Sequence, residues 1–317
     1  LSPIVEGGSA GEALRNSLAL ARHAEELGFK RFWLAEHHNF PGVASAATAV
    51  VIAHIAAGTQ RIRVGAGGIM LPNHAPYVIA EQFGTLEALH PGRIDLGLGR
   101  APGSDGPAQA ALRRSFHSAE RFPDDVLELM GWFEDRFSPV RAVPGAGADI
   151  PIWILGSSLF GAQLAASLGL PFAFASHFAP QQLEQALALY RKSFRPSAKL
   201  ARPHVMLALN VIAADSDEEA RTLFSSIQQA FVALRRGTPG AFPPPVANFE
   251  SQLTLDERAL LKHMLSCSVV GAREAVAAGI AEFAERHAPD ELIITCQIFD
   301  HEKRMRSLSL TREAVGD

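Results

Sequence analysis

The chain has 317 residues, of which 48% are hydrophobic and 20% are charged, and 29 basic against 33 acidic side chains give a formal net charge of −4. This composition is typical of a soluble globular protein with room for one large α/β domain or two small ones. The slightly acidic balance, without basic runs, argues against nucleic acid or an anionic membrane as the main partner. Small molecules are therefore the expected ligands.

Neither a membrane span nor a disulfide framework is indicated. The longest weakly polar stretch, residues 45–58, is shorter than the ~20 residues that a membrane-spanning helix requires. Cys267 and Cys296 are far apart and form no CxxC motif, which favours a reducing compartment. We therefore expect a cytoplasmic protein. Because Leu1 is not a methionine, a preceding segment of the native chain stays an open alternative.

Short β-type runs alternate with helix-type runs along the chain, which is the pattern of parallel βα units. Eight such units in a chain of this length predict a (β/α)8 TIM barrel of the α/β class, forming a single domain over residues 1–317. The predicted strands are 31–37, 62–66, 93–98, 151–155, 171–175, 204–212 and 291–296, and residues 1–5 are predicted to be the tail of an eighth strand truncated at its start. The predicted helices are 11–27, 45–57, 76–89, 118–135, 159–168, 180–194, 216–235 and 271–286.

One segment, residues 237–248, is too rich in proline and glycine for the interior of a helix or strand. It is predicted to be an inserted loop between the seventh and eighth strands, on the side where barrel enzymes keep their active sites. Either a mobile lid or an irregular surface connection would have this composition.

The stretch FWLAEHHN places titratable groups at the end of the first complete strand. Neighbouring residues of a strand face opposite sides, so Glu36 and His38 share one face and His37 has the other. A metal held by both histidines would need a bulge, and no HExxH or similar motif adds ligands, so no metal is expected. A lone histidine here is either a hydrogen-bonded structural residue or a catalytic one, and the end of a barrel strand favours catalysis.

Two short motifs have simpler explanations. Gly7 to Gly11 matches the G-x-S-x-G elbow of serine hydrolases, but Ser9 followed by Glu12 is also a capping box that opens the first helix. The pair Gly97 and Gly99 resembles the start of a dinucleotide-binding motif, but the third glycine, Gly103, comes one residue late. We therefore favour a helix cap for the first motif and reject a dinucleotide site for the second.

Two strand ends could together bind one phosphate. Arg100 follows the strand RIDLGL, and its permanently charged fork suits a phosphate group. Gly156, Ser157 and Ser158 close the next strand and precede a helix, whose N-terminal N–H groups favour an anion; simple N-capping by a serine is the alternative. The glycines 67 and 68 could clear space for a flat ring or mark a bend or bulge.

Several long blocks of this chain resemble the bacterial luciferase-like flavin-dependent monooxygenases. The blocks are WLAEHHN, VGAGGIMLPNHAPYVIAEQFGTLEALHPGRIDLGLGRAPG, WILGSSLFGAQLAASLG and AFASHF, and the resemblance extends over nearly the whole chain. It implies a luciferase-like (β/α)8 barrel that uses reduced FMN, supplied by a separate flavin reductase, to activate O2. Ser157 stands where luciferase has glutamate, which implies the non-luminescent branch.

The resemblance also implies roles for individual residues. His37 matches the catalytic histidine near the flavin, and Gly67 and Gly68 match a pair joined by a cis peptide against the flavin ring. Arg100 and Ser158 match the phosphate ligands. We further assign Ala35, Gly156 and Ser157 to the cofactor site, and His177 and Phe178 to the substrate.

These observations predict an FMN-dependent monooxygenase that oxygenates a small organic substrate. A flavin- or deazaflavin-dependent dehydrogenase on the same barrel is the main alternative, and a serine hydrolase using Ser9 is a second. A flavin-binding protein without turnover is a third. We also expect a homodimer packed through the helices 45–57 and 76–89, because the first is crowded with alanines that allow close helix approach.

Overall fold

The computed structural model describes residues 1–101, 105–114 and 116–316, so that Gly103 lies outside the described residues. The chain divides into two compact units. Unit 1 comprises Leu1–Ser2, Ser17–Phe40 and Ser45–Gly156, and unit 2 comprises Pro3–Asn16, Pro41–Ala44 and Ser157–Asp317. The prediction of a single domain over the whole chain stays a prediction.

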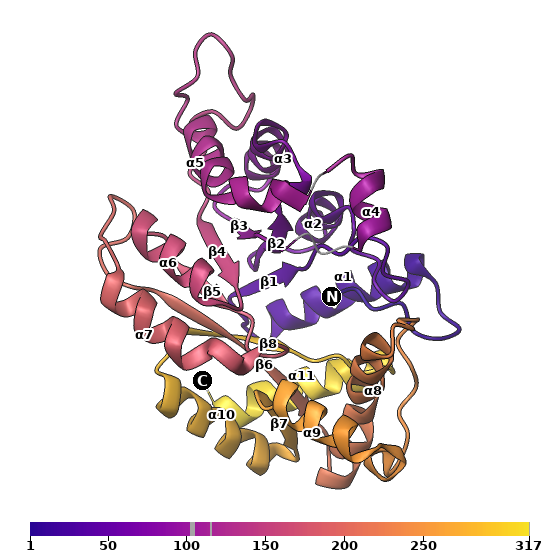
Figure 1. Cartoon of the computed structure of the whole chain (residues 1–317). Helices are drawn as coiled ribbons and strands as arrows, with labels where there is room; N and C mark the ends of the chain where they lie inside the picture. Colours follow the sequence, from indigo (N-terminus) through magenta and orange to yellow (C-terminus); the bar gives the residue numbers. More distant parts are fainter. Residues whose placement is uncertain (102–104, 115, 317) are drawn as a thin grey trace. The chain divides into compact units, whose positions relative to one another are not determined.

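Unit 1 is built on four parallel strands that pair in chain order. These are β1 (Arg31–Leu34), β2 (Arg63–Met70), β3 (Ile94–Gly99) and β4 (Ile152–Gly156). The helices α2, α3 and α5 flank them, and every residue of β3 is buried (Figure 1). The helices are α2 (Thr48–Ala57), α3 (Pro76–Leu89), α4 (Gly106–Ala111) and α5 (Phe122–Phe133), the 3-10 turns are η1 (Leu71–Asn73) and η2 (Phe116–Arg121), and α1 (Ala10–Glu26) has residues in both units.

Unit 2 is built around one long strand, β6 (Val205–Ala213), all of whose residues are buried. It pairs in parallel with β5 (Phe172–Phe174) and β8 (Glu291–Thr295) through its first half and with β7 (Ser268–Gly271) through its last four residues. The remaining elements are the helices α6 (Leu159–Leu168), α7 (Leu183–Ser193), α8 (Asp217–Arg235), α9 (Leu255–Met264), α10 (Arg273–His287) and α11 (His301–Val315), with the 3-10 turns η3 (Pro180–Gln182) and η4 (Phe249–Gln252).

The eight parallel strands of the described residues alternate with helices, which confirms the predicted α/β class. All seven predicted complete strands are present, although β1 ends at Leu34 rather than at residue 37. Strand β7 and the helices α4, α9 and α11 were not predicted. Residues 1–5 form isolated bridges through Pro3 and Val5 rather than a strand.

The two motifs with simpler explanations can now be compared with the structure. Ser9 Oγ accepts a hydrogen bond from the backbone N–H of Glu12 at 3.2 Å, immediately before α1 begins. The serine therefore caps a helix, as the sequence indicated. Between β3 and α4 the chain includes residues outside the described ranges, so the dinucleotide motif is described only as far as Gly99.

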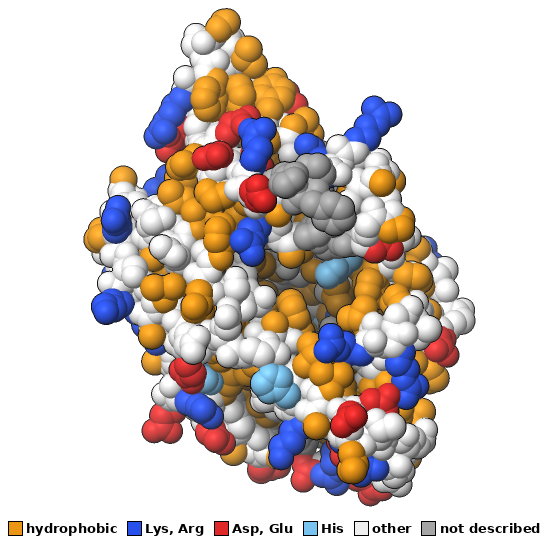
Figure 2. All heavy atoms as spheres, viewed as in Figure 1, with side chains coloured by type: hydrophobic (Ala, Val, Ile, Leu, Met, Phe, Trp, Pro, Cys, Tyr) orange, Lys and Arg blue, Asp and Glu red, His pale blue; other side chains and the backbone are white. Residues whose placement is uncertain are grey.

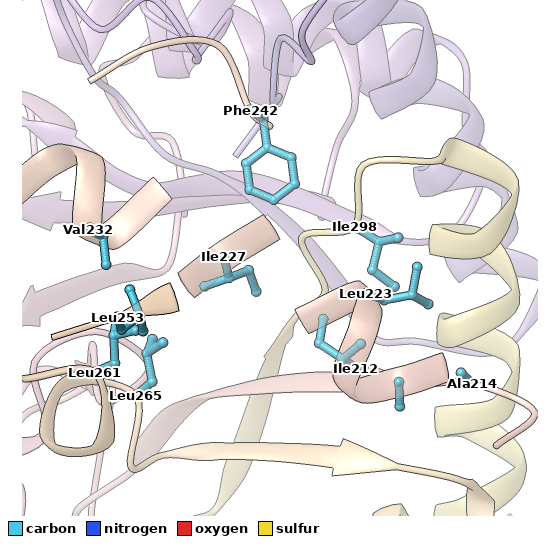
Figure 3. Close-up of a cluster of buried hydrophobic side chains, with 11 residues drawn as sticks. Ile212, Ala214, Leu223, Ile227, Val232, Phe242, Leu253, Leu261, Leu265 and Ile298 are labelled. Atoms are coloured by element: carbon cyan, nitrogen blue, oxygen red, sulfur yellow. The ribbon is translucent and has the colours of Figure 1, made fainter. Parts of the chain in front are cut away.

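An apolar cluster forms the core of one side of unit 2. Figure 3 shows side chains of β6, α8 and α9 meeting there with Phe242 of the loop 237–248 and with Ile298. Burying apolar surface of this kind is the main stabilising contribution to a fold. The cluster consists of Ile212, Ala214, Ala220, Leu223, Ile227, Val232, Phe242, Leu253, Leu261, Leu265 and Ile298.

The loop 237–248 is tied to unit 2 through its middle. Phe242 is buried, its N–H donates to the carbonyl of Ile4 at 2.7 Å, and its carbonyl accepts from the N–H of Glu6 at 2.9 Å. The N–H of Val246 donates to Ser225 Oγ at 2.7 Å. Any lid motion of this loop would have to break these bonds or leave Phe242 in place.

Charged side chains are dispersed over the surface that Figure 2 shows. Basic and acidic groups alternate there with hydrophobic and neutral ones instead of gathering into one basic field. Among the described residues, no helix is both long and apolar enough to cross a bilayer.

Two leucines of α9, one buried in the apolar cluster and one exposed, test how much the cluster contributes to the free energy of unfolding. Leu261 is 4% exposed within the cluster, whereas Leu255 on the same helix is 81% exposed. We expect Leu261→Ala to lower the free energy of unfolding by about 2–4 kcal/mol, because it leaves a cavity. Leu255→Ala should change it by less than about 0.5 kcal/mol. Urea denaturation measures both, and equal losses would contradict the assigned core.

Candidate active site

His37 follows β1 in unit 1, and within the described part of the chain its ring nitrogens have no hydrogen-bond partner. Among the described residues the structure shows no hydrogen bond to this ring, which lies near the ring of Phe40, with centroids 5.9 Å apart. Burial lowers the pKa of His37 to about 4. The alternative of a structural, hydrogen-bonded histidine is therefore not supported, and at neutral pH the imidazole is uncharged.

Glu36, immediately before His37, is the centre of a hydrogen-bonded cluster. Its Oε1 accepts from His38 Nε2 at 2.7 Å and from His74 Nε2 at 2.9 Å, and Asn73 Nδ2 lies 3.5 Å away. Its Oε2 accepts from the backbone N–H of Met70 at 3.2 Å. Burial alone would raise the pKa of Glu36, but the hydrogen bonds and charge of the two histidines hold that pKa below its ordinary value. The predicted face-sharing of Glu36 and His38 is confirmed by their contact.

Glu36, His38 and His74 also have the composition of a metal site, since their ligand atoms lie within 4.8 Å of one another. However, both imidazole Nε2 atoms lie at hydrogen-bond distance from one oxygen of an ionised carboxylate, which can only accept. A metal at the usual bond lengths of about 2.0–2.2 Å would have to replace these bonds. The arrangement described is a hydrogen-bonded cluster, and we assign no metal to it.

A second buried carboxylate, Asp95 on β3, joins three strands of unit 1. Its Oδ2 accepts from Arg31 Nη1 at 2.6 Å and from Trp33 Nε1 at 3.0 Å, and its Oδ1 accepts from Arg63 Nε at 2.9 Å and Nη2 at 2.7 Å. Asp95 is fully buried, so these bonds replace the water that it has lost. Through them the indole of Trp33 is fixed beside Gly67.

The glycine run of β2 contains a bulge. Strand pairing with β3 shifts register between Ala66 and Ile69, so that β2 carries an extra residue there. The peptide bond between Gly67 and Gly68 is cis, as the resemblance implied. The sequence-based alternative of a bend or bulge is therefore present in the structure.

Neighbouring protein atoms account for both glycines. A Cβ on Gly67 would lie 3.0 Å from Trp33 Cε3, and one on Gly68 would lie 2.8 Å from the carbonyl oxygen of Gly97. The backbone of β3 therefore requires glycine at position 68, and Trp33 leaves a Cβ at position 67 only a tight contact. Contact of this pair with a flat ring stays a prediction.

The other predicted cofactor residues of unit 1 lie at strand ends. The carbonyl of Ala35, just beyond β1, accepts from Ser45 Oγ at 2.6 Å. Arg100 directly follows β3 and is exposed. Gly156 is the last residue of β4. All three therefore stand at the carboxyl ends of strands, where the residues of parallel α/β enzymes bind ligands.

In unit 2, Ser157 and Ser158 precede α6. Ser158 occupies the N-cap position, but its hydroxyl makes no capping hydrogen bond. The N–H of Leu159 donates instead to Gln182 Oε1 at 3.2 Å, and the first turn of α6 carries no acidic residue. Capping therefore does not explain Ser158, and a free hydroxyl at a helix N-terminus fits a phosphate group.

His177 and Phe178 follow β5. Their rings meet edge to face with centroids 4.8 Å apart, and Phe178 is 41% exposed. The His177 Nδ1 atom is buried and has no hydrogen-bond partner among the described residues. Burial lowers the pKa of His177 to about 3. A buried polar atom without a protein partner is suited to a ligand or an ordered water.

A buried asparagine on β6 supports this segment. Asn210 Nδ2 donates to the carbonyl of His177 at 2.6 Å and to Ser268 Oγ at 3.1 Å, and its Oδ1 accepts from Thr295 Oγ1 at 2.5 Å. Asn210 thus connects β6, β7 and β8 to the residues after β5. Asn210 is buried within a strand, where a polar side chain needs hydrogen-bond partners, and these three bonds provide them.

The sequence reasoning missed Asn210 and the partners of Glu36. A signal for the latter was present, because Asn73 and His74 come just after β2 in the stretch LPNH. Polar side chains that follow neighbouring parallel strands gather at one edge of the sheet. Asn210 had a weaker signal, a single amide within an otherwise apolar nine-residue strand.

The two uncharged histidines should make stability depend on pH. Their pKa values are about 4 for His37 and about 3 for His177, below the ordinary 6.5, so near pH 6 the unfolded chain binds more protons than the folded one. Stability should therefore rise with pH up to about 6.5, by up to about 1.4 kcal/mol per pH unit for each histidine. Urea unfolding at several pH values measures this slope. The double variant His37→Gln, His177→Gln should flatten it, and an unchanged slope would contradict the burial of these rings.

The sequence profile of the luciferase-like monooxygenases matches residues 2–289. A luciferase-like monooxygenase of Escherichia coli (strain K12) is 54% identical over 99% of this chain and 94% of its own length. Among solved structures, apo-MsnO8 has a TM-score of 0.91 and is 34% identical, covering 99% of this chain and 96% of its own.

Two less similar solved structures share the fold. The oxygenating constituent of 3,6-diketocamphane monooxygenase from Pseudomonas putida, in complex with FMN, has a TM-score of 0.74 at 16% identity and covers 98% of this chain and 94% of its own. An F420-dependent secondary alcohol dehydrogenase has a TM-score of 0.72 at 15% identity and covers 97% of this chain and 96% of its own. The predicted luciferase-like TIM-barrel fold is confirmed, and the chain belongs to the luciferase-like monooxygenase family.

Proposed function

We propose that the protein is an FMN-dependent monooxygenase that uses reduced FMN, delivered by a separate flavin reductase, and O2 to oxygenate a small organic substrate. The observation that carries the proposal is the ring of His37, whose nitrogens have no hydrogen-bond partner among the described residues while both neighbours, Glu36 and His38, are engaged. Membership of the family supports the redox chemistry. In this proposal the flavin supplies the activation of O2, and the protein binds, orients and excludes water.

The residues at the strand ends provide hydrogen-bond donors and a positive charge for the phosphate of FMN, and small residues for its ring. Ser158, with an uncommitted hydroxyl at the N-terminus of α6, would bind the phosphate with Ser157. Arg100, at the end of β3, is proposed as a further phosphate ligand. Gly156 would leave room for the phosphate. The flavin ring would lie against Gly67 and Gly68, beside Ala35.

His37 would act as a hydrogen-bond partner rather than as a strong base. With a pKa of about 4 the imidazole is neutral at pH 7. One ring nitrogen can then donate a hydrogen bond and the other can accept one. A group of such low pKa takes up a proton only weakly at neutral pH. It would therefore stabilise oxygen bound near the flavin and hold a proton in place there. His177 and Phe178 are proposed to contact the substrate.

A deazaflavin-dependent dehydrogenase is the second candidate, favoured by the shared fold of the F420-dependent alcohol dehydrogenase. The same strand ends would bind that cofactor, and hydride transfer would need no O2. The cofactor that copurifies with the protein separates the two, because FMN and deazaflavins differ in absorbance and mass.

We also propose a homodimer that packs through α2 and α3. These helices expose apolar side chains, with Val50 on α2 69% exposed and Leu89 at the end of α3 64% exposed. Covering such side chains is a common role of subunit interfaces. Light scattering at micromolar concentration should give twice the mass of the chain, and Val50→Asp should shift it towards the monomer. A monomeric mass for the unaltered protein would contradict the proposal.

Arg100 and Ser158 should matter for FMN but not for riboflavin, which lacks the phosphate. Loss of a charge-assisted contact costs about 1.5–3 kcal/mol, so Arg100→Ala should weaken FMN roughly tenfold to a hundredfold. Ser158→Ala should weaken FMN in the same direction. Fluorescence titration with each ligand measures both effects, with the exposed Arg136→Ala as control. Equal weakening of FMN and riboflavin would place these residues away from the phosphate.

His37 should govern what happens to O2. When the protein loaded with reduced FMN is mixed with O2, H2O2 release should lag behind O2 uptake. In His37→Ala the lag should shorten by up to about tenfold, the effect of losing one hydrogen bond worth about 0.5–1.5 kcal/mol. The thermal midpoint should fall only by the loss of ring packing, because no hydrogen bond to the described residues is lost. The exposed His54→Ala serves as control. A large fall in the midpoint with an unchanged lag would make His37 structural.

A further inference from the structure

The side chain of Glu36 closes a short loop of chain around His37. Glu36 and His38 lie on either side of it, and their side chains are joined by the 2.7 Å bond between Glu36 Oε1 and His38 Nε2. This bond fixes the backbone on both sides of His37. The imidazole of His37, with no bond of its own to the described residues, takes its direction from that backbone and from packing on Phe40.

The same carboxylate ties this segment to the end of β2. Its Oε2 accepts from the N–H of Met70, two residues after Gly68, and its Oε1 accepts from His74 just after η1. The side chain of Glu36 is 1% exposed, whereas those of His38 and His74 are 19% and 26% exposed. The chain segments that carry His37 and the glycine pair are therefore fixed to each other through one buried group.

Stability alone does not explain a buried charge at this position. Burying a carboxylate costs free energy, and apolar residues of similar volume often replace buried ion pairs without loss of stability. What an apolar residue cannot supply is direction, because only the carboxylate fixes two imidazoles and a backbone N–H at defined angles.

We propose that Glu36, held by His38 and His74, is a positioning residue that sets the orientation of the His37 ring relative to the end of β2. The inference rests on the role proposed for His37, but its test requires neither flavin nor turnover. Glu36 touches neither the substrate nor the cofactor in this assignment and acts through His37.

The direction in which the pKa of His37 changes in a Glu36 variant shows whether Glu36 positions the ring or acts on it only through its negative charge. Of the neighbouring side chains, Glu36 raises the pKa of His37 through its charge and His38 lowers it. Glu36→Gln removes the negative charge, so with an unchanged geometry the pKa of His37 must fall. If the ring instead loses its fixed, buried position, its pKa must rise towards the ordinary value of about 6.5.

The experiment is an NMR pH titration of histidine-labelled, ligand-free protein. We expect Glu36→Gln to raise the pKa of His37 from about 4 by about one unit. The amide of Met70 should also exchange faster with solvent, because its acceptor is weakened. A fall in the His37 pKa, or no change, would overturn the positioning role.

A matched pair at the half-buried His74 keeps the test valid if Glu36→Gln does not fold. His74→Gln retains a donor near the place of Nε2, and His74→Ala removes it, while both remove any charge of the imidazole. We expect a higher His37 pKa in His74→Ala than in His74→Gln. Equal values would overturn the proposal. A pKa shift as expected together with an unchanged O2-dependent lag in His37→Ala would leave the positioning intact and refute the proposed function instead.

Discussion

The burial of Asp95 is the constraint around which unit 1 is arranged. A carboxylate with no exposed surface must find hydrogen-bond donors within the protein, and here they come from Arg31 and Trp33 on β1 and from Arg63 on β2. The three strands are thereby fixed in register at one end. Because Trp33 is one of the donors, the same interaction places an indole against Gly67, where an added Cβ would lie only 3.0 Å from Trp33 Cε3.

Strand β1 is therefore held by carboxylates at both ends. Asp95 engages its beginning, and Glu36 engages the segment just beyond its last residue. Only four residues of β1 form regular strand, so hydrogen bonding along the sheet is a weak constraint on the residues that follow. The Glu36 cluster replaces that constraint where the sheet ends. A site built from irregular backbone can in this way be as well ordered as the strands that lead to it.

Local patterns predicted much of the fold. Helices α3 and α6 have the predicted bounds. A proline stands at the start of α3, and Gly169 in the left-handed conformation ends α6. Helix α9 was missed although Thr254 and Glu257 form a capping box visible in the sequence. Strand β7 was missed because four residues are too few for a periodic pattern.

The candidate site was predictable only in part, for a physical reason. The two-residue period of a strand was sufficient to place Glu36 and His38 together and His37 apart. The contact between Glu36 and His74 joins residues 38 positions apart. Such a contact depends on how neighbouring strands pair, and no local spacing encodes it. The same holds for Asn210, whose partners lie 33 to 85 positions away.

The anchoring of the loop 237–248 has a consequence for directed evolution. Gly237 and Gly240 have open space where a side chain would project, whereas Phe242, two residues later, is buried in the apolar cluster and bonded to Ile4 and Glu6. Gly240 should accept varied residues, while Gly237, with a positive φ of 73°, should prefer asparagine or aspartate. Libraries confined to residues 237–241 would reshape the outer part of the loop without uncovering the core. Libraries that include Phe242 would select mainly for folding.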